Sequence, residues 1–94
     1  MNKELLQKAI NIYGREAQQD MCIEEMSELT KAICKAKRNR YYLTTQIKEN
    51  LYEEIADVYI MLEQLVMMYD CENEVKKQIA NKLARLESRL REND

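Results

Sequence analysis

The chain has 94 residues, of which 46% are hydrophobic and 34% charged, with one glycine and no proline. This composition excludes a membrane-spanning, collagen-like or proline-rich protein. It also disfavours a strand-rich fold, because hairpins need turn residues that this chain hardly contains. We therefore predict one all-α domain over residues 1–94, whose surplus apolar surface favours a homodimer or homotetramer over a monomer.

The charges are segregated along the chain, although the net charge is only −2. Residues 29–48 contain six basic residues and no acid, whereas residues 49–75 contain eight acids and no base. Apolar residues at helical spacing interrupt the acidic block, which predicts a packed helix. The basic run either guides a phosphate ligand or balances the acidic helix. No nucleic-acid partner is expected, because the chain is net negative and carries no known reading motif.

The cysteine and histidine content limits the chemistry. Cys22, Cys34 and Cys71 are widely spaced and odd in number, and the chain has no histidine. These features argue against a disulfide framework and against a zinc site. Without histidine, catalysis has to use carboxylates, lysines or a metal ion. No apolar run has the length of a signal peptide or a membrane span, so we expect a cytoplasmic protein with no membrane partner.

Two helices are predicted in the first half of the chain. The first covers about residues 2–18, with Gly14 as a weak point. The second is capped by Asp20 and fades near Asn39. Its apolar stripe consists of Cys22, Met26, Leu29, Ile33 and Ala36.

Two further helices follow a loop at residues 39–45. Thr44 or Thr45 caps the third helix, which reaches about Tyr69 and has an apolar stripe centred near Leu51 and Leu62. Four more apolar residues of this helix fall outside that stripe: Ile60, Met61, Met67 and Met68. They either face a further partner or fill gaps in the core. The fourth helix begins near Glu72, and its apolar stripe consists of Val75, Ile79, Leu83, Leu86 and Leu90.

The second and third helices repeat one acidic pattern, in which two adjacent glutamates are followed three residues later by another acid. Its members are Glu24, Glu25 and Glu28, then Glu53, Glu54 and Asp57. At 100° per residue, the second and third acid of each set flank the apolar stripe with the same hand. An antiparallel pair of helices therefore directs these four acids into one groove, while the first acid of each set points outward.

Four carboxylates in a half-buried groove repel one another unless a cation joins them. Hard oxygen ligands without histidine favour Mg²⁺, or Mn²⁺, over zinc or copper. The alternative is that the acids are solvated helix faces that only maintain solubility. In that case the chain is a non-catalytic helical module for interaction or oligomerisation.

These motifs resemble the MazG-type all-α nucleoside triphosphate pyrophosphohydrolases, whose signature is EExxE followed after a gap by ExxD. The sequence EEMSEL matches the first block and EEIADV the second. Tyr13, Gly14 and Gln18 resemble the lead-in YGxxxQ, although the family often has tryptophan where Tyr13 stands. Lys82 and Arg85 resemble a basic segment of the last helix. The likeness extends over most of the chain and implies a single MazG-like helical domain.

The resemblance implies a four-helix bundle that hydrolyses a nucleoside triphosphate to the monophosphate and pyrophosphate. It assigns Mg²⁺ to Glu25, Glu28, Glu54 and Asp57. Water is then the nucleophile, and either Glu24 or Glu25 takes its proton. The resemblance also assigns Gln18, Lys82 and Arg85 to the nucleotide phosphates, in the same subunit or a neighbouring one. Lys82 and Arg85 are equally consistent with a solvated helix face, and the preferred base stays open.

Overall fold

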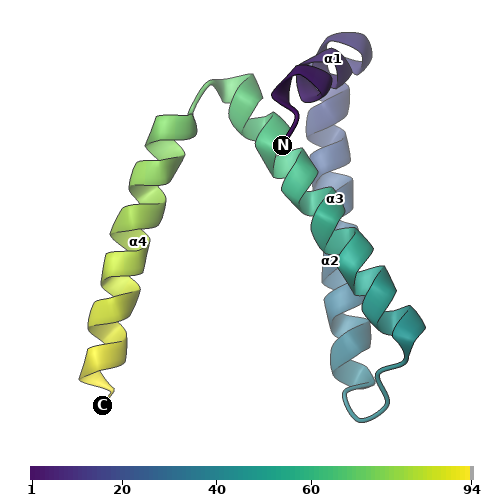
Figure 1. Ribbon diagram of the computed structural model, residues 1–94, viewed down its shortest axis with the longest axis vertical. Helices are drawn as coiled ribbons and strands as arrows, with labels where there is room; N and C mark the ends of the chain where they lie inside the picture. The colour runs from purple at the N-terminus through teal and green to yellow at the C-terminus, as the bar shows by residue number, and fades with distance from the viewer. Residues whose placement is uncertain (94) are drawn as a thin grey trace.

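The computed structural model describes residues 1–93, and these form helices without strands (Figure 1). The helices are α1 (Lys3–Tyr13), α2 (Arg15–Arg38), α3 (Thr45–Tyr69) and α4 (Glu72–Glu92). The predicted all-α class is confirmed. The α2 and α3 helices form an antiparallel pair, α1 packs across one end of this pair, and α4 projects away from it. No helix within residues 1–93 is both long and apolar enough to cross a membrane.

The break between α1 and α2 lies at Gly14. The Asn2 side chain caps α1 by accepting a hydrogen bond from the Leu5 amide at 3.0 Å. Gly14 has a φ of 93°, a conformation that side-chain-bearing residues rarely adopt, and α2 begins at the next residue. The predicted first helix to residue 18 was therefore wrong. Asp20 was also wrong as a cap, because it lies inside α2.

The other predicted helix ends agree with the structure. Asn39 follows the last residue of α2, and the Thr44 hydroxyl caps α3 by accepting a hydrogen bond from the Ile47 amide at 3.2 Å. The α3 helix ends at Tyr69, and Asp70 adopts a left-handed conformation with φ 49°. The fourth helix begins at Glu72, as predicted.

The core lies mainly between α2 and α3. Its buried residues are Leu6, Cys22, Ala32, Val58, Met61 and Met68, together with the polar Gln18 and Gln64. The predicted stripe of α3 was therefore wrong: Leu62 is 42% exposed, whereas Met61 is only 5% exposed. Met61 and Met68 provide much of the α3 side of this core, and methionine side chains adapt to irregular gaps. The face that packs is therefore not the one with the strongest apolar stripe.

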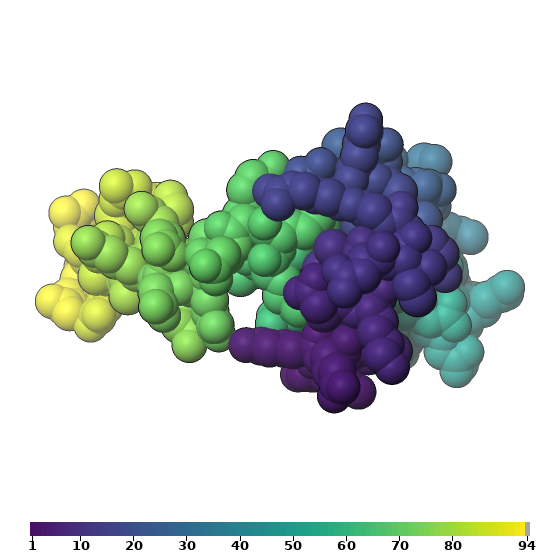
Figure 2. All heavy atoms as spheres, turned by 90° about the horizontal axis from the view of Figure 1, so that it is seen from above, coloured from purple at the N-terminus to yellow at the C-terminus, as the bar shows by residue number. Residues whose placement is uncertain are grey.

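The fourth helix does not complete a bundle within one chain. It packs only against α3, its contact with α1 is the exposed ion pair between Lys3 and Glu72, and none of its residues is buried. Viewed from above, α4 forms a mass of its own beside the other three helices (Figure 2). The radius of gyration is 16.7 Å, against about 12 Å for a compact chain of this length. The single chain is thus a three-helix unit with an extended helical arm.

Candidate metal centre

Three carboxylates from two helices come together near the middle of the α2–α3 pair. Glu25 lies on α2, while Glu54 and Asp57 lie one turn apart on α3. Each offers one oxygen, and these oxygens lie within 4.8 Å of one another. Glu25 and Glu54 are half-buried, whereas Asp57 is exposed. The structure thus brings together three of the four acids that the sequence analysis assigned to one groove, and we call these three the acidic cluster.

Repulsion within the acidic cluster disfavours its ionised form. Partial burial raises the pKa of Glu25 above its ordinary value, and the charges of Asp57 and Glu54 raise it further. Partial burial likewise raises the pKa of Glu54, with added effects from the charges of Asp57 and Glu28. Both shifts have the direction expected when carboxylates crowd one another without a compensating cation.

One oxygen of the cluster lacks any partner. Glu54 Oε2 is buried and has no hydrogen-bond partner among the described residues. None of the ion pairs formed within residues 1–93 involves a carboxylate of the acidic cluster. Since a buried polar atom is costly when unpaired, this oxygen calls for a donor or a cation.

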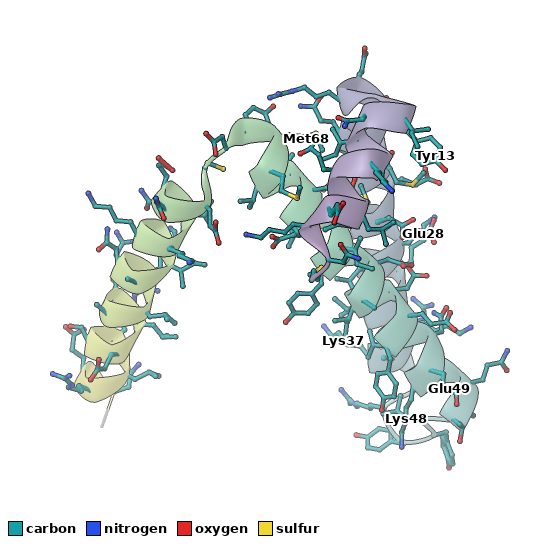
Figure 3. The ribbon with its side chains drawn as sticks, turned by 45° about the horizontal axis from the view of Figure 1, so that its top comes forward. Tyr13, Glu28, Lys37, Lys48, Glu49 and Met68 are labelled. Atoms are coloured by element: carbon teal, nitrogen blue, oxygen red, sulfur yellow. The ribbon has the colours of Figure 1, made fainter. Side chains whose placement is uncertain are left out.

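Glu28 lies at the edge of the acidic cluster. Its charge contributes to the raised pKa of Glu54, but its carboxylate pairs with Lys31 at 3.6 Å. Figure 3 shows Glu28 between Tyr13, near one end of the α2–α3 pair, and Lys37, toward the other. The neighbouring Glu24 is exposed and lies outside the cluster. The cluster of three is therefore tighter than the predicted set of four.

The residues that the resemblance assigned to nucleotide phosphates are not near the acidic cluster in one chain. Lys82 and Arg85 are exposed on the projecting α4. Gln18 is buried, and its Nε2 donates a hydrogen bond to Gln64 Oε1 at 2.7 Å. The amide of Gln18 therefore takes part in the core, and its assignment to the nucleotide phosphates stays a prediction. Gln64 was not predicted from the sequence, where its only signal is a polar residue within an apolar stretch of α3.

The basic run of residues 31–40 forms a positively charged end of the α2–α3 pair. In Figure 3, Lys37 and Lys48 both lie toward the end of the pair that carries the α2–α3 loop. Within residues 1–93, Lys31 is the one member of this run that forms an ion pair. Direct pairing with the acidic helix therefore does not account for the remaining positive charges.

The donors of the acidic cluster suit a small hard cation. Three carboxylate oxygens without a histidine or thiol match Mg²⁺ or Mn²⁺ and not zinc. Mg²⁺ bonds of about 2.0–2.1 Å place its ligand oxygens about 3–4 Å apart. The observed oxygens, all within 4.8 Å of one another, are close to this spacing. The chain thus fits a divalent cation at this position.

No family model, curated protein or solved structure matches this chain. Its function is therefore inferred from the residues of the site and from the motifs that carry them.

Proposed function

We propose that this protein is a Mg²⁺-dependent nucleoside triphosphate pyrophosphohydrolase, which converts a (d)NTP and water to a (d)NMP and pyrophosphate. The observation that carries the proposal is the acidic cluster, with oxygens from two helices within 4.8 Å and one buried oxygen unpartnered. The EExxE and ExxD motifs support the same chemistry, because their resemblance to MazG-type enzymes concerns these carboxylates.

Glu25, Glu54 and Asp57 would hold the cation, and Glu28, whose charge acts on Glu54, would join them on releasing Lys31. When bound, Mg²⁺ or Mn²⁺ supplies neutralisation of the phosphate charge and lowers the pKa of a bound water. A triphosphate carries about four negative charges, so bare carboxylates alone would repel it. This requirement explains why the same acids serve an anionic substrate.

Water is the nucleophile in the proposed reaction. Its oxygen forms a bond to the α-phosphorus, and the bond from that phosphorus to the bridging oxygen of pyrophosphate breaks. We assign the proton that the water loses to a carboxylate oxygen of Glu25, because this side chain belongs to the cluster that would hold the cation. Glu24 is the alternative base, one residue away but exposed.

Positive charge for the phosphates comes from the basic end of the α2–α3 pair. Lys35, Lys37 and Arg38 follow Glu28 along α2 and are exposed. Such a group of cations beside a metal site raises the local concentration of an anionic substrate. Lys82 and Arg85 can contribute only if the α4 helix of a second chain brings them there.

The test is release of pyrophosphate from a panel of canonical and altered dNTPs in the presence of Mg²⁺. Glu54→Gln and Asp57→Asn should each lose most of the activity. Glu49→Gln, on the same helix but outside the acidic cluster, is the matched control and should keep it. Turnover of no nucleotide, or full activity in the first two variants, would refute the proposal.

The second candidate, a non-catalytic interaction module, is favoured by the exposed apolar stripe of α4. Thermal melts separate the two candidates, because a ligand that binds the native state raises the midpoint. The enzyme should melt higher with Mg²⁺ and a non-hydrolysable triphosphate, whereas the module should melt at an unchanged temperature.

A further inference from the structure

The apolar stripe of α4 has no partner within its own chain. Its residues are between 37% and 59% exposed: Val75, Ile79, Leu83, Leu86 and Leu90. These residues are spaced along most of α4 (Glu72–Glu92), the helix drawn on the left of Figure 1. Because an isolated helix is marginally stable in water, a helix of this kind normally depends on packing of its apolar side.

A second unpartnered apolar surface lies along the α2–α3 pair, and we call it the bare face. Its residues are between 37% and 64% exposed: Ile23, Met26 and Ile33 of α2, with Ile55, Leu62 and Tyr69 of α3. The two helices contribute to one side of the pair, since Gln19 Nε2 donates to the Tyr69 hydroxyl at 2.8 Å. Ile23, Met26 and Tyr69 also line a common hollow of about 420 Å³. Helical spacing extends this side along both helices.

The start of α4 is held in its projecting direction. Only Asp70 and Cys71 connect it to α3. The Cys71 amide donates to the Val66 carbonyl and the Asp70 amide to the Met67 carbonyl, each at 3.2 Å, which closes the end of α3. Lys3 of α1 pairs with Glu72 at 3.5 Å. Folding α4 back onto the bare face of its own chain would therefore break contacts at this connection.

We infer that α4 docks on the bare face of a second copy of this chain, and that the second copy's α4 docks in return. Reciprocal exchange satisfies the two-fold symmetry that most homodimers have, and each chain offers both surfaces. It covers the stripe and the bare face together, while the connection after α3 keeps its observed geometry.

The size of the contact suits a stable dimer. The 21 residues of α4 form a rod about 32 Å long and about 10 Å wide, which covers about 300 Å² on each partner. Two reciprocal contacts then bury about 1,200 Å² in total, at the lower end of the range for specific interfaces.

The charges of α4 and α3 are also complementary. Residues 76–91 of α4 contain six bases and one acid, whereas residues 49–63 of α3 contain five acids and no base. Lys82 and Arg89 flank the α4 stripe on one side, as the 100° helical period places them. An α4 helix from the second chain therefore brings positive charge to the acidic helix, which its own α4 does not reach.

The first experiment measures molecular mass in solution by analytical ultracentrifugation. The wild-type chain should sediment as a dimer, with twice the 11.3 kDa chain mass. Leu83→Glu/Leu86→Glu on the stripe should raise the dimer dissociation constant by about 100-fold or more. Ala84→Glu/Ser88→Glu adds the same two charges to the opposite side of α4 and is the matched control, which should remain dimeric.

A second pair of substitutions tests the other surface. Ile55→Glu/Leu62→Glu on the bare face should also yield monomers whose far-ultraviolet circular dichroism stays helical. A dimer that survives this change would mean that α4 pairs with α4, and the inference would fail. A monomeric wild type with a radius of gyration near 12 Å by X-ray scattering would mean that α4 closes on its own chain, which also overturns it.

A third measurement uses only the wild-type chain. Unlabelled and ¹⁵N-labelled chains are refolded together and treated with a carbodiimide, which joins lysines to nearby carboxylates. With equal amounts of the two chains, about half of the cross-links between the lysines of α4 and the acids of α3 should join one light to one heavy peptide, as random pairing in a dimer gives. If every such cross-link joins peptides of one isotopic kind, the docking is intramolecular and the inference is wrong.

Discussion

The buried contact between Gln18 and Gln64 gives a quantitative test of the core and of the site together. The two side chains are only 7% and 3% exposed, and the hydrogen bond between them is 2.7 Å long. Replacing Gln18 by methionine keeps the volume and the helix propensity, but leaves Gln64 Oε1 buried without its donor. Such a loss costs about 1–3 kcal/mol of unfolding free energy. Replacing Gln64 by methionine leaves the Gln18 amide equally unpaired.

The double substitution Gln18→Met/Gln64→Met removes both polar groups at once. Its stability should return to within about 1 kcal/mol of wild type, because an apolar pair of the same shape leaves nothing unpaired. The two substitutions are thus coupled by about 2 kcal/mol or more. Urea unfolding at one fixed protein concentration measures all four proteins, since association makes stability concentration-dependent.

The same variants test whether Gln18 has a role beyond the core. If Gln18 serves only the core, pyrophosphate release by the double variant should equal that of wild type under conditions where both are folded. Costs of the single substitutions that simply add in the double variant would refute the coupling. A stable double variant that no longer hydrolyses nucleotides would instead place Gln18 at the substrate.

Three further predictions concern pH and helix ends. Because folding raises the pKa of Glu25 and Glu54 above 4.5, the native state binds their protons more tightly than the unfolded chain. The urea midpoint of metal-free protein in EDTA should therefore rise as pH falls from 7 through the folded pKa values toward 4.5, and a falling midpoint would contradict the repulsion. Thr44→Ala should lose about 1 kcal/mol of unfolding free energy, because it removes the α3 cap. The control Thr45→Ala, at the next position, should change the unfolding free energy little. Equal losses in the two variants would show that the Thr44 hydroxyl is not the cap. Gly14→Ala should lose about 1–2 kcal/mol of unfolding free energy, because alanine is strained at the positive φ of this position. Crowding adds nothing to this cost, since an added Cβ meets no atom within 4 Å. An unchanged urea midpoint would refute this backbone strain.

The sequence by itself determined the helix ends that depend on local hydrogen bonds. A hydroxyl at Thr44 can cap the helix that follows it whatever lies around, so the start of α3 was predictable. Gly14 was visible as a weak point, but its ability to end α1 outright depended on a backbone angle that glycine permits and does not require. The extent of the first two helices was wrong for that reason.

The convergence of the three acids of the cluster could also be predicted from the sequence. Helical spacing and an antiparallel pairing are enough to direct Glu25, Glu54 and Asp57 to a common place. The position of the Glu28 carboxylate could not be predicted, because its long side chain can turn either to the cluster or to Lys31 on the next turn.

Only the tertiary structure decided which apolar side of α3 packs within the chain. That helix has apolar residues around most of its circumference, so the sequence allowed either Met61 or Leu62 to be buried in the core. In the folded chain the methionine side of α3 is buried and Leu62 is left exposed. The direction of α4 was likewise undetermined, because a two-residue connector permits several directions and contacts with other helices select one. Periodicity identifies which surfaces are apolar, whereas shape and contacts between residues far apart in the sequence decide which of these surfaces is buried.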